Sequence, residues 1–491
     1  MIVKRTINTF DVFDTLIARR CVTPTNIFVI MEERLGIPNF ANIRIQSERD
    51  LLGAHYSFDQ IYEGVKRVLG LDHTTVTSIM ELEISIELEN IIPIKENITK
   101  VRDGDLLISD QYLSREIIMS FLKAAGFDKQ CALIVSNYGK HHGEIWPAIL
   151  ARFDIERHLG DNPHADGYSP AQHGIDFELT DRSQIQPVEK ILFEAQFSKL
   201  ASLMRALRLT TWEEDNIRRR VQETQLLLNF PILIFSSMIL RKTAQHLNKS
   251  RIVFSARDCF KWKILFETLF PNEFECEYYY TSRYSKCLGD EDYISYSNKI
   301  ISDDCIIVDL CGSGWSLEKF AQDLLCETLD VFFIHKMPQN RDYMQDSLHP
   351  KCRFHHIVEN SFDVYKNHIL EIANFASHPM LRTMANVKDV FCPIFFKEGR
   401  SDTELSYIAL QHETFDACVD AVSQFGIDEH LTEFNVNILC DLVKIFYRLL
   451  SQDVFSHTVY AANFFKENGE VESKLAQLSK SRRTHVDSRP F

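Results

Sequence analysis

The segment Thr9-Phe10-Asp11-Val12-Phe13-Asp14-Thr15-Leu16 continues a run of β-branched and apolar residues that begins at Ile2. The run predicts a short strand with Asp11 at its carboxyl end and Thr15 four residues later. In an open α/β sheet, ligands bind at this end of the strands. An aspartate there can attack phosphorus or ligate a hard cation, but it can also simply cap the next turn. The segments that follow decide between these roles.

Strands and helices alternate after this first strand. Strands are predicted at 105–109, 131–136 and just before 158–162, with helices at 114–125 and 143–153. This alternation predicts a parallel sheet with crossover helices.

Residues 23–98 differ from this pattern and predict successive helices, inserted directly after the first strand. Within them, residues 78–89 alternate glutamate with apolar residues. That period fits a strand, but the length and the lack of turn signals favour a helix.

Four polar elements follow predicted strand ends. They are Asp11 with Thr15, then Ser109, then Lys140 in Gly139-Lys-His-His-Gly143, and finally Gly160-Asp161-Asn162 with Asp166. Each is ambiguous alone, because a strand-end serine can cap a helix, a lysine can be a surface residue and Gly-Asp can be a turn. Together they place carboxylates, a hydroxyl and an ammonium around one crevice of the predicted sheet.

Such a set can support phosphoryl transfer, because an anionic phosphate ester must be neutralised before a carboxylate attacks it. We expect a Mg²⁺ ion held by Asp11, the backbone carbonyl of Phe13 and Asp161, with Asp166 orienting its water ligands. Lys140 and the Ser109 hydroxyl would hold the phosphoryl oxygens. The covalent intermediate would be an aspartyl phosphate that water then hydrolyses.

The set resembles the four motifs of the haloacid dehalogenase (HAD) superfamily, whose members are mostly phosphatases. The resemblance covers residues 1–185 and rests on Phe10-Asp-Val-Phe-Asp-Thr-Leu16, Ile108-Ser-Asp-Gln-Tyr-Leu113, the lysine three residues before Gly143, and Gly160-Asp-Asn with Asp166. It implies a Rossmann-like parallel sheet with a helical cap inserted at about 18–103. It also implies a site of catalytic residues Asp11, Asp14, Ser109 and Lys140, substrate-binding residues Thr15, Ser109, Asp110 and Lys140, and metal ligands Asp11, Phe13, Asp161 and Asp166.

Phe13 departs from the pattern of the phosphatases. In most of them the second residue after the nucleophile is an aspartate that protonates the leaving group, whereas an aromatic residue there also occurs in dehalogenases. Asp14 or a cap residue supplies the proton, or the leaving group needs little help, or the domain mainly binds its ligand. General acid catalysis contributes roughly 10²–10⁴-fold, so its loss would weaken the enzyme without abolishing turnover.

The second half of the chain predicts long helices from about 188, a second α/β domain up to about 385, and a mainly helical region over 386–491 with a basic tail at 480–491. Two strand-end loops, Ser255-Ala-Arg-Asp258 and Asp309-Leu-Cys-Gly-Ser-Gly314, look like the phosphate loops of phosphoribosyltransferases, although paired acidic residues are missing. The second loop also resembles the first motif of methyltransferases, and a purely structural turn fits equally well.

Composition limits the classes of function. The net charge of −15 argues against nucleic acid or an anionic membrane as the main partner. The twelve cysteines are scattered without metal-ligand spacing, which predicts reduced thiols in a cytoplasmic protein. The most apolar segment, 226–240, contains Asn229 and Pro231 and predicts a buried helix, not a membrane span.

The sequence therefore predicts a Mg²⁺-dependent phosphatase for a small phosphorylated metabolite. The layout is similar to proteins associated with bacterial surface-polysaccharide synthesis, which by analogy suggests a sugar or polyol phosphate as substrate. Two alternatives stay open: a HAD-like binding protein with impaired hydrolysis, and a bifunctional enzyme whose second α/β domain performs glycosyl or methyl transfer.

Overall fold

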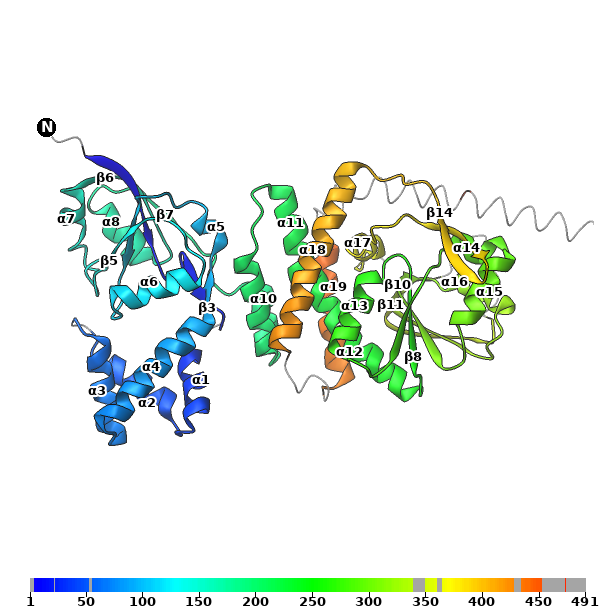
Figure 1. Cartoon of the computed structure of the whole chain (residues 1–491), viewed down its shortest axis with the longest axis horizontal. Helices are drawn as coiled ribbons and strands as arrows, with labels where there is room; N and C mark the ends of the chain where they lie inside the picture. Colours follow the sequence, from blue (N-terminus) through cyan, green and yellow to red (C-terminus); the bar gives the residue numbers. More distant parts are fainter. Residues whose placement is uncertain are drawn as a thin grey trace, which may run out of the picture. The chain divides into compact units, whose positions relative to one another are not determined.

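The structure is a computed structural model that describes residues 4–21, 23–52, 55–338, 349–359, 364–427, 434–452 and 473 (Figure 1). The chain divides into two compact units, Met1–Trp212 and Glu213–Phe491. Each unit contains a five-stranded parallel sheet, so the predicted α/β class is confirmed. The predicted basic tail at 480–491 lies outside the described residues.

The sheet of the first unit has the strand order β5-β4-β1-β6-β7. Its strands are β1 (Arg5–Asp11), β4 (Leu106–Ser109), β5 (Ala132–Val135), β6 (Phe153–Gly160) and β7 (Phe177–Leu179). The chain builds outward from β1 to β4 and β5, and then returns to the other side of β1 with β6 and β7. The strand order reverses at β1, and in open α/β sheets ligands bind outside the carboxyl ends of the strands at such a point, here β1, β4 and β6.

Short helices connect the strands of this sheet: α5 (Lys95–Ile98), α6 (Arg115–Ala124), α7 (Trp146–Leu150) and α8 (Ser169–Ala171). Ser114 begins α6 by accepting a hydrogen bond from the amide of Ile117. The face of α6 that carries Ile118, Phe121 and Leu122 is buried against the sheet. The predicted α/β alternation of residues 105–160 is therefore confirmed.

The inserted segment is helical, as predicted. It contains α1 (Asn26–Leu35), α2 (Phe40–Arg49), α3 (Phe58–Leu69) and α4 (His73–Asn90), which group together in Figure 1. Residues 78–89 lie inside α4, so the helical alternative was correct. A two-stranded antiparallel ribbon of β2 (Ile17–Arg19) and β3 (Ile91–Pro93) connects this helical insertion, residues 26–90, to the sheet; the insertion is called the cap below, as a name for these residues only.

One hydrophobic core joins the cap to the sheet. It includes Phe10 and Leu107 from the strands together with Ile27, Met31 and Phe40 from the cap helices. The burial of these side chains stabilises the cap against the sheet domain, since each fully buried aliphatic or aromatic side chain contributes about 1.5–3 kcal/mol.

The first unit extends beyond the predicted boundary at 185, to Trp212. Helices α9 (Pro187–Glu194) and α10 (Ser198–Thr210) continue it. Leu209 of α10 packs with Ala18, Ile92 and Ile94 of the cap connection. Arg208 of α10 pairs with Glu189 of α9 at 2.6 Å while both side chains are buried, which fixes the two helices to each other.

The sheet of the second unit has the order β12-β11-β10-β8-β9. Its strands are β8 (Arg251–Ser255), β9 (Glu275–Tyr279), β10 (Cys305–Gly312), β11 (Leu329–Lys336) and β12 (Cys352–Glu359), which pair in parallel. The helices between the strands are α13 (Phe260–Leu269), α14 (Arg283–Leu288), α15 (Glu291–Ile300) and α16 (Trp315–Phe320).

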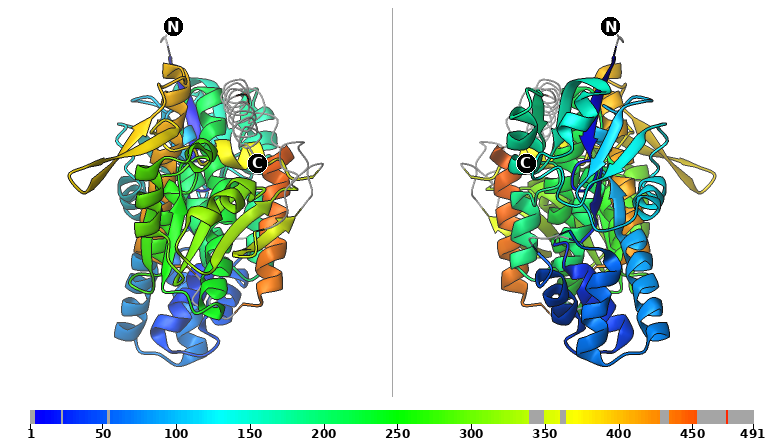
Figure 2. Two further views of the ribbon diagram at one scale, coloured as in Figure 1. Left: turned by 90° about the vertical axis from the view of Figure 1, so that its right-hand side faces the viewer. Right: turned by 90° about the vertical axis from the view of Figure 1, so that its left-hand side faces the viewer.

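An antiparallel hairpin of β13 (Leu381–Val387) and β14 (Val390–Phe395) belongs to the second unit and projects from it (Figure 2). The helices α11 (Asn216–Thr224), α12 (Phe230–His246), α17 (Asn367–Ile372), α18 (Asp402–Phe425) and α19 (Val436–Gln452) complete the unit. Helix α18 packs on α11 and α13, and α19 packs on α12. The described residues of the second unit are therefore not divided near 385 as the sequence predicted.

The stretch Asn216–His246 is long and apolar enough to cross a membrane by composition, but 83% of its apolar window is buried inside the structure. This bears out the buried helix predicted for 226–240. The twelve cysteines, all within the described residues, are free thiols, as predicted.

Candidate active site

Three of the predicted residues lie at the carboxyl edge of the first sheet because their strands are neighbours. Asp11 is the last residue of β1 and pairs in register with Ile108, so Ser109 ends the adjacent strand β4 one residue further on. Asp161 follows directly after β6, the other neighbour of β1. Asp11 and Ser109 are buried, whereas Asp161 is partly exposed.

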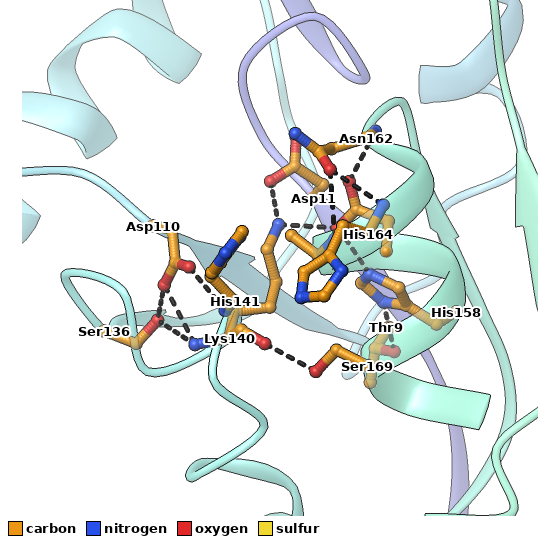
Figure 3. Close-up of polar contacts among 12 residues, drawn as sticks. Thr9, Asp11, Asp110, Ser136, Lys140, His141, His158, Asn162, His164 and Ser169 are labelled. Atoms are coloured by element: carbon orange, nitrogen blue, oxygen red, sulfur yellow. Dashed lines mark hydrogen bonds and ion pairs between the residues drawn. The ribbon is translucent and has the colours of Figure 1, made fainter. Parts of the chain in front are cut away.

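Lys140 reaches the site from the loop after β5. Its Nζ forms ion pairs with Asp11 Oδ1 and, at 2.7 Å, with Asp166 Oδ1 (Figure 3). The Lys140 side chain is 3% exposed, so two carboxylates and one ammonium meet nearly out of contact with water. Burial lowers the pKa of Lys140, but the charges of Asp11 and Asp166 outweigh it and hold the pKa above its usual range, which keeps the lysine charged.

Asp110 holds the Lys140 loop in place. Its Oδ1 accepts a hydrogen bond from the backbone N–H of Lys140 at 3.0 Å, and its Oδ2 accepts one from His141 N–H at 2.7 Å. The Ser136 hydroxyl also donates to Asp110, and Ser169 donates to the Lys140 carbonyl at 2.6 Å. The carboxylate that the sequence assigned to substrate binding is thus engaged by the loop that positions the lysine.

Asp166 lies in a short π-helical turn, Pro163–Tyr168, that Asn162 caps by accepting from the amides of His164 and Ala165. The Asp166 carboxylate accepts from Asn162 N–H at 2.9 Å and from His158 Nε2 at 2.9 Å. Burial raises the pKa of Asp166, but its hydrogen bonds to His158 and Lys140 and the charge of Lys140 hold the pKa well below its usual range.

Gly160 allows this close approach, because a β-carbon at position 160 would lie 2.1 Å from Cγ of Asp166. Position 160 is therefore a glycine for a steric reason, because any side chain there would displace Asp166.

His158 connects Asp166 to the first strand. Its Nδ1 is 2.8 Å from the hydroxyl of Thr9, two residues before Asp11. The imidazole is fully buried, and burial lowers its pKa, which favours the neutral ring. Since a carboxylate only accepts, Nε2 carries the proton toward Asp166 and Nδ1 accepts from Thr9. Thr9, His158, Asp166, Lys140 and Asp11 form one continuous buried chain of polar contacts.

The carboxylates of Asp11, Asp161 and Asp166 offer ligand oxygens that all lie within 4.8 Å of one another. Burial raises the pKa of Asp11 to about 7, and the charge of Asp166 adds to this while Lys140 opposes it. Burial raises the pKa of Asp161 to about 8, assisted by the charges of Asp11 and Asp14. Three carboxylates thus share one ammonium, and the cluster has an excess of negative charge.

Phe13 and Asp14 point to different environments. The Phe13 ring is buried and packs edge-on against Phe121 at 6.2 Å between ring centroids, with the Arg19 guanidinium 5.2 Å from its centroid. Asp14 adopts a left-handed backbone (φ 57°), and its half-buried carboxylate lies 3.8 Å from Arg205 Nη2 of α10. Burial raises the pKa of Asp14, against the charges of Arg19 and Arg205.

The Thr15 hydroxyl is buried and favours the charged form of Asp11. The rings of His141 and His164 lie beside the cluster with 4.3 Å between their centroids and are tilted by 40° to each other. His164 is exposed. The structure thus gathers Asp11, Thr15, Lys140, Asp161 and Asp166 into one site.

Sequence reasoning missed Arg205 and the role of Thr9. Arg205 lies 194 positions from Asp11 on a helix assigned to another domain, and no local pattern identifies it. Thr9 did carry a signal, because alternate residues of a strand share a face and Thr9 lies two positions from Asp11.

The two loops singled out in the second unit follow β8 and β10, which are neighbours in its sheet. Asp309 is still within β10, and its pKa is raised to about 6 by burial, which the charges of Lys286 and Arg283 oppose. Arg257 stacks over Phe375 with its guanidinium carbon 4.4 Å from the ring centroid. Charged residues therefore also gather at the carboxyl edge of the second sheet.

No family model and no curated protein matches the chain. Among solved structures, it is similar to the L-2-haloacid dehalogenase of Xanthobacter autotrophicus with chloropropionic acid covalently bound, at 11% sequence identity and a TM-score of 0.27. The similarity covers 43% of this chain and 91% of the dehalogenase chain. At this TM-score the likeness carries no argument about function, which depends on the geometry of the site.

Proposed function

We propose that the first unit is a Mg²⁺-dependent phosphatase of the HAD type that hydrolyses a small phosphomonoester, a sugar or polyol phosphate being favoured. The observation that carries the proposal is the buried Asp11–Lys140–Asp166 cluster, with Asp161 beside it, at the point where the strand order of the sheet reverses. A buried carboxylate held beside an ammonium is suited to attack an anionic ester, because the ammonium offsets the charge of the incoming phosphoryl group.

The residues present fit a divalent cation. The oxygens of Asp11, Asp161 and Asp166 lie within 4.8 Å of one another, and the pKa values of Asp11 and Asp161 are raised first by burial and then by the charge of neighbouring carboxylates, which one lysine does not balance. These three side chains and the Phe13 carbonyl would hold Mg²⁺, an ion that prefers oxygen ligands. A bound ion would offset the charge of the phosphoryl group and orient it.

In the reaction, an oxygen of Asp11 forms the bond to phosphorus while the ester P–O bond breaks. Lys140 and the Ser109 hydroxyl hold the phosphoryl oxygens, and the leaving oxygen takes up a proton. Water then attacks phosphorus, which releases phosphate and restores the Asp11 carboxylate.

We assign the proton transfer to Asp14, since the Phe13 ring has no proton to donate and is turned into the core. Asp14 is close enough for its charge to act on Asp161, and burial raises the pKa of Asp14, which favours the protonated form that a general acid needs. Arg205 at 3.8 Å would stabilise the carboxylate that remains.

Phosphate release from a panel of phosphomonoesters, with and without Mg²⁺, tests the proposal. The parent protein should release phosphate only with Mg²⁺, and Asp11→Asn should abolish release. Asp128→Asn removes a carboxylate that is 77% exposed and serves as the matched control. If no ester is hydrolysed and Asp11→Asn matches the parent, phosphatase activity is refuted and a HAD-like binding protein, the alternative that Phe13 favours, replaces it.

The role of Asp14 has a separate test in the leaving group. The aryloxide of an aryl phosphate can leave without a proton, whereas the alkoxide of an alkyl phosphate needs one. Asp14→Asn should lower kcat/KM for an alkyl phosphate by roughly 10²–10⁴-fold and change that for an aryl phosphate little. An equal loss on both esters would remove Asp14 from this role.

A further inference from the structure

Two histidines of the first unit meet outside the aspartate cluster of Asp11, Asp161 and Asp166. His141 lies in the loop after β5, and His164 lies in the π-helical turn that follows β6. Their ring centroids are 4.3 Å apart (Figure 3). Imidazoles from two separate segments of the chain are therefore brought to one place.

The backbone holds both histidines in position. Asp110 accepts a hydrogen bond from His141 N–H at 2.7 Å, and Asn162 accepts one from His164 N–H at 2.9 Å. On the far side of the pair from His141, the ring of Tyr168 stacks on His164 with 5.3 Å between centroids. The approach of the two imidazoles thus follows from the same contacts that shape the two loops.

The ring nitrogens of this pair are available to a ligand. Within the part of the chain that the structure describes, no protein group forms a hydrogen bond with a ring nitrogen of His141 or His164. His158 differs, because it is fully buried and both of its ring nitrogens contact protein groups. His141 is half-buried and His164 is exposed, so an ion from solution can reach them.

The spacing of the rings fits a shared metal ion. Imidazole nitrogens bind Zn²⁺ at about 2.0–2.1 Å, so two imidazoles on one tetrahedral ion have ring centroids roughly 5 Å apart. The observed 4.3 Å is slightly shorter, and the tilt of 40° means that the rings do not form a parallel stack. A small rotation of the exposed His164 side chain makes room for an ion between the two rings.

Imidazole selects a different metal from the aspartate cluster. Zn²⁺, Ni²⁺ and Cu²⁺ bind well to imidazole nitrogen, whereas Mg²⁺ prefers oxygen ligands. The three carboxylates whose oxygens lie within 4.8 Å of one another form a group without any imidazole. The two groups of side chains therefore have different ligand chemistry, although they belong to the same loops.

We propose that His141 and His164 bind one Zn²⁺ ion, or a similar transition-metal ion, with water completing its coordination. The ion ties the loop that carries Lys140 to the turn that carries Asp166. This second metal site does not depend on the phosphatase proposed above, because neither histidine has a role in that reaction.

Calorimetric titration of the full chain with Zn²⁺, in an excess of Mg²⁺, tests the proposal. The parent protein should show a Zn²⁺ step that His141→Gln and His164→Gln each weaken by about a hundredfold or more, because one remaining imidazole replaces two-point binding. His73→Gln, on an exposed residue at the start of α4, should keep the step. An unchanged step in His141→Gln or His164→Gln would overturn the proposal.

A variant of the aspartate cluster separates the two sites. Asp161→Asn should keep the Zn²⁺ step, since its carboxylate is not a ligand of the proposed ion. Loss of the step in this variant would place Zn²⁺ among the carboxylates and overturn the proposal. Because Zn²⁺ binding is measured without turnover, neither result depends on whether the protein hydrolyses a phosphomonoester.

Hydrogen exchange tests the connection between the two loops. Zn²⁺ should slow the exchange of amides in both segments, 139–145 and 162–168, of the parent protein and in neither segment of His164→Gln. Protection of one segment alone, or protection that persists in His164→Gln, would contradict an ion shared by the two histidines.

Discussion

Replacement of Lys140 by methionine should destabilise the first unit, and Mg²⁺ should repair part of the loss. Methionine keeps most of the side-chain volume but removes the ammonium that pairs with Asp11 and, at 2.7 Å, with Asp166. Because these side chains are 9% exposed or less, the variant leaves buried carboxylates without their counter-charge. Breaking a buried pair in this way costs about 3–5 kcal/mol.

The pH determines how much of this cost is seen. The pKa of Lys140 is raised in the folded state, so its contribution is present throughout pH 6–8 and is lost only in strongly alkaline solution. The pKa of Asp11 is already raised to about 7 with the lysine present, and removal of the lysine raises it further. Protonation of Asp11 therefore relieves the variant at pH 6, and the cost is expected to be larger at pH 8.

Hydrogen exchange of the amides in β1 and β4 measures the effect in the full chain, where a single unfolding free energy for two units would be ill-defined. In Lys140→Met these amides should exchange about a hundredfold faster or more at pH 8, less so at pH 6, and Mg²⁺ should slow them. Lys123→Met on the exposed face of α6 is the control. Equal exchange in the two variants, unaffected by Mg²⁺, would refute the charge balance described for the site.

Three further predictions concern the same cluster. Affinity for Mg²⁺ should rise by roughly tenfold or more from pH 6 to pH 8, with proton release, because Asp11 and Asp161 have raised pKa values and bind a cation only when deprotonated; calorimetry in two buffers measures both quantities. His158→Gln should weaken Mg²⁺ binding by roughly 10–100-fold, since the imidazole orients Asp166 at 2.9 Å. Gly160→Ala should abolish Mg²⁺ binding and lower the unfolding temperature, because its β-carbon would lie 2.1 Å from Asp166 Cγ.

Each of these has a matched control and a result that contradicts it. A Mg²⁺ affinity that is flat or falls over pH 6–8 would mean that the two aspartates do not titrate as ligands. His73→Gln, on an exposed residue at the start of α4, should bind Mg²⁺ like the parent, and the same behaviour in His158→Gln would exclude its orienting role. Gly399→Ala places its β-carbon in open space, so equal effects of the two glycine variants would exclude the steric argument.

Much of the first unit could be predicted because its signals are local. Strand β4 is a short apolar run that ends at its first polar residue, Ser109, while Asp11 ends β1 and Asp161 directly follows β6. Parallel strands bring these ends to one edge, so the sequence alone predicted the gathering of side chains. The ion pairs of Lys140 could not be predicted, since they depend on a loop whose shape Asp110 and the Ser169 contact determine.

The remainder required contacts between distant segments. Arg205 and Arg208 lie on α10, and both are buried because carbonyl and carboxylate groups of other segments accept their hydrogen bonds. The strand β12 was missed because Cys352–Glu359 mixes charged and apolar residues, as suits an edge strand that only β11 pairs. Neither feature leaves a periodic pattern in the sequence.

The most direct test of the proposed function is the detection of phosphate on Asp11 itself. The parent protein is mixed with Mg²⁺ and a phosphomonoester that it hydrolyses. The reaction is quenched in acid within one turnover, and the protein is digested and analysed by mass spectrometry. The phosphatase predicts one phosphoryl group on the peptide that contains Asp11, removable by hydroxylamine and absent from Asp11→Asn. Phosphate release without any modification of Asp11, or with modification of another residue, would contradict the proposal.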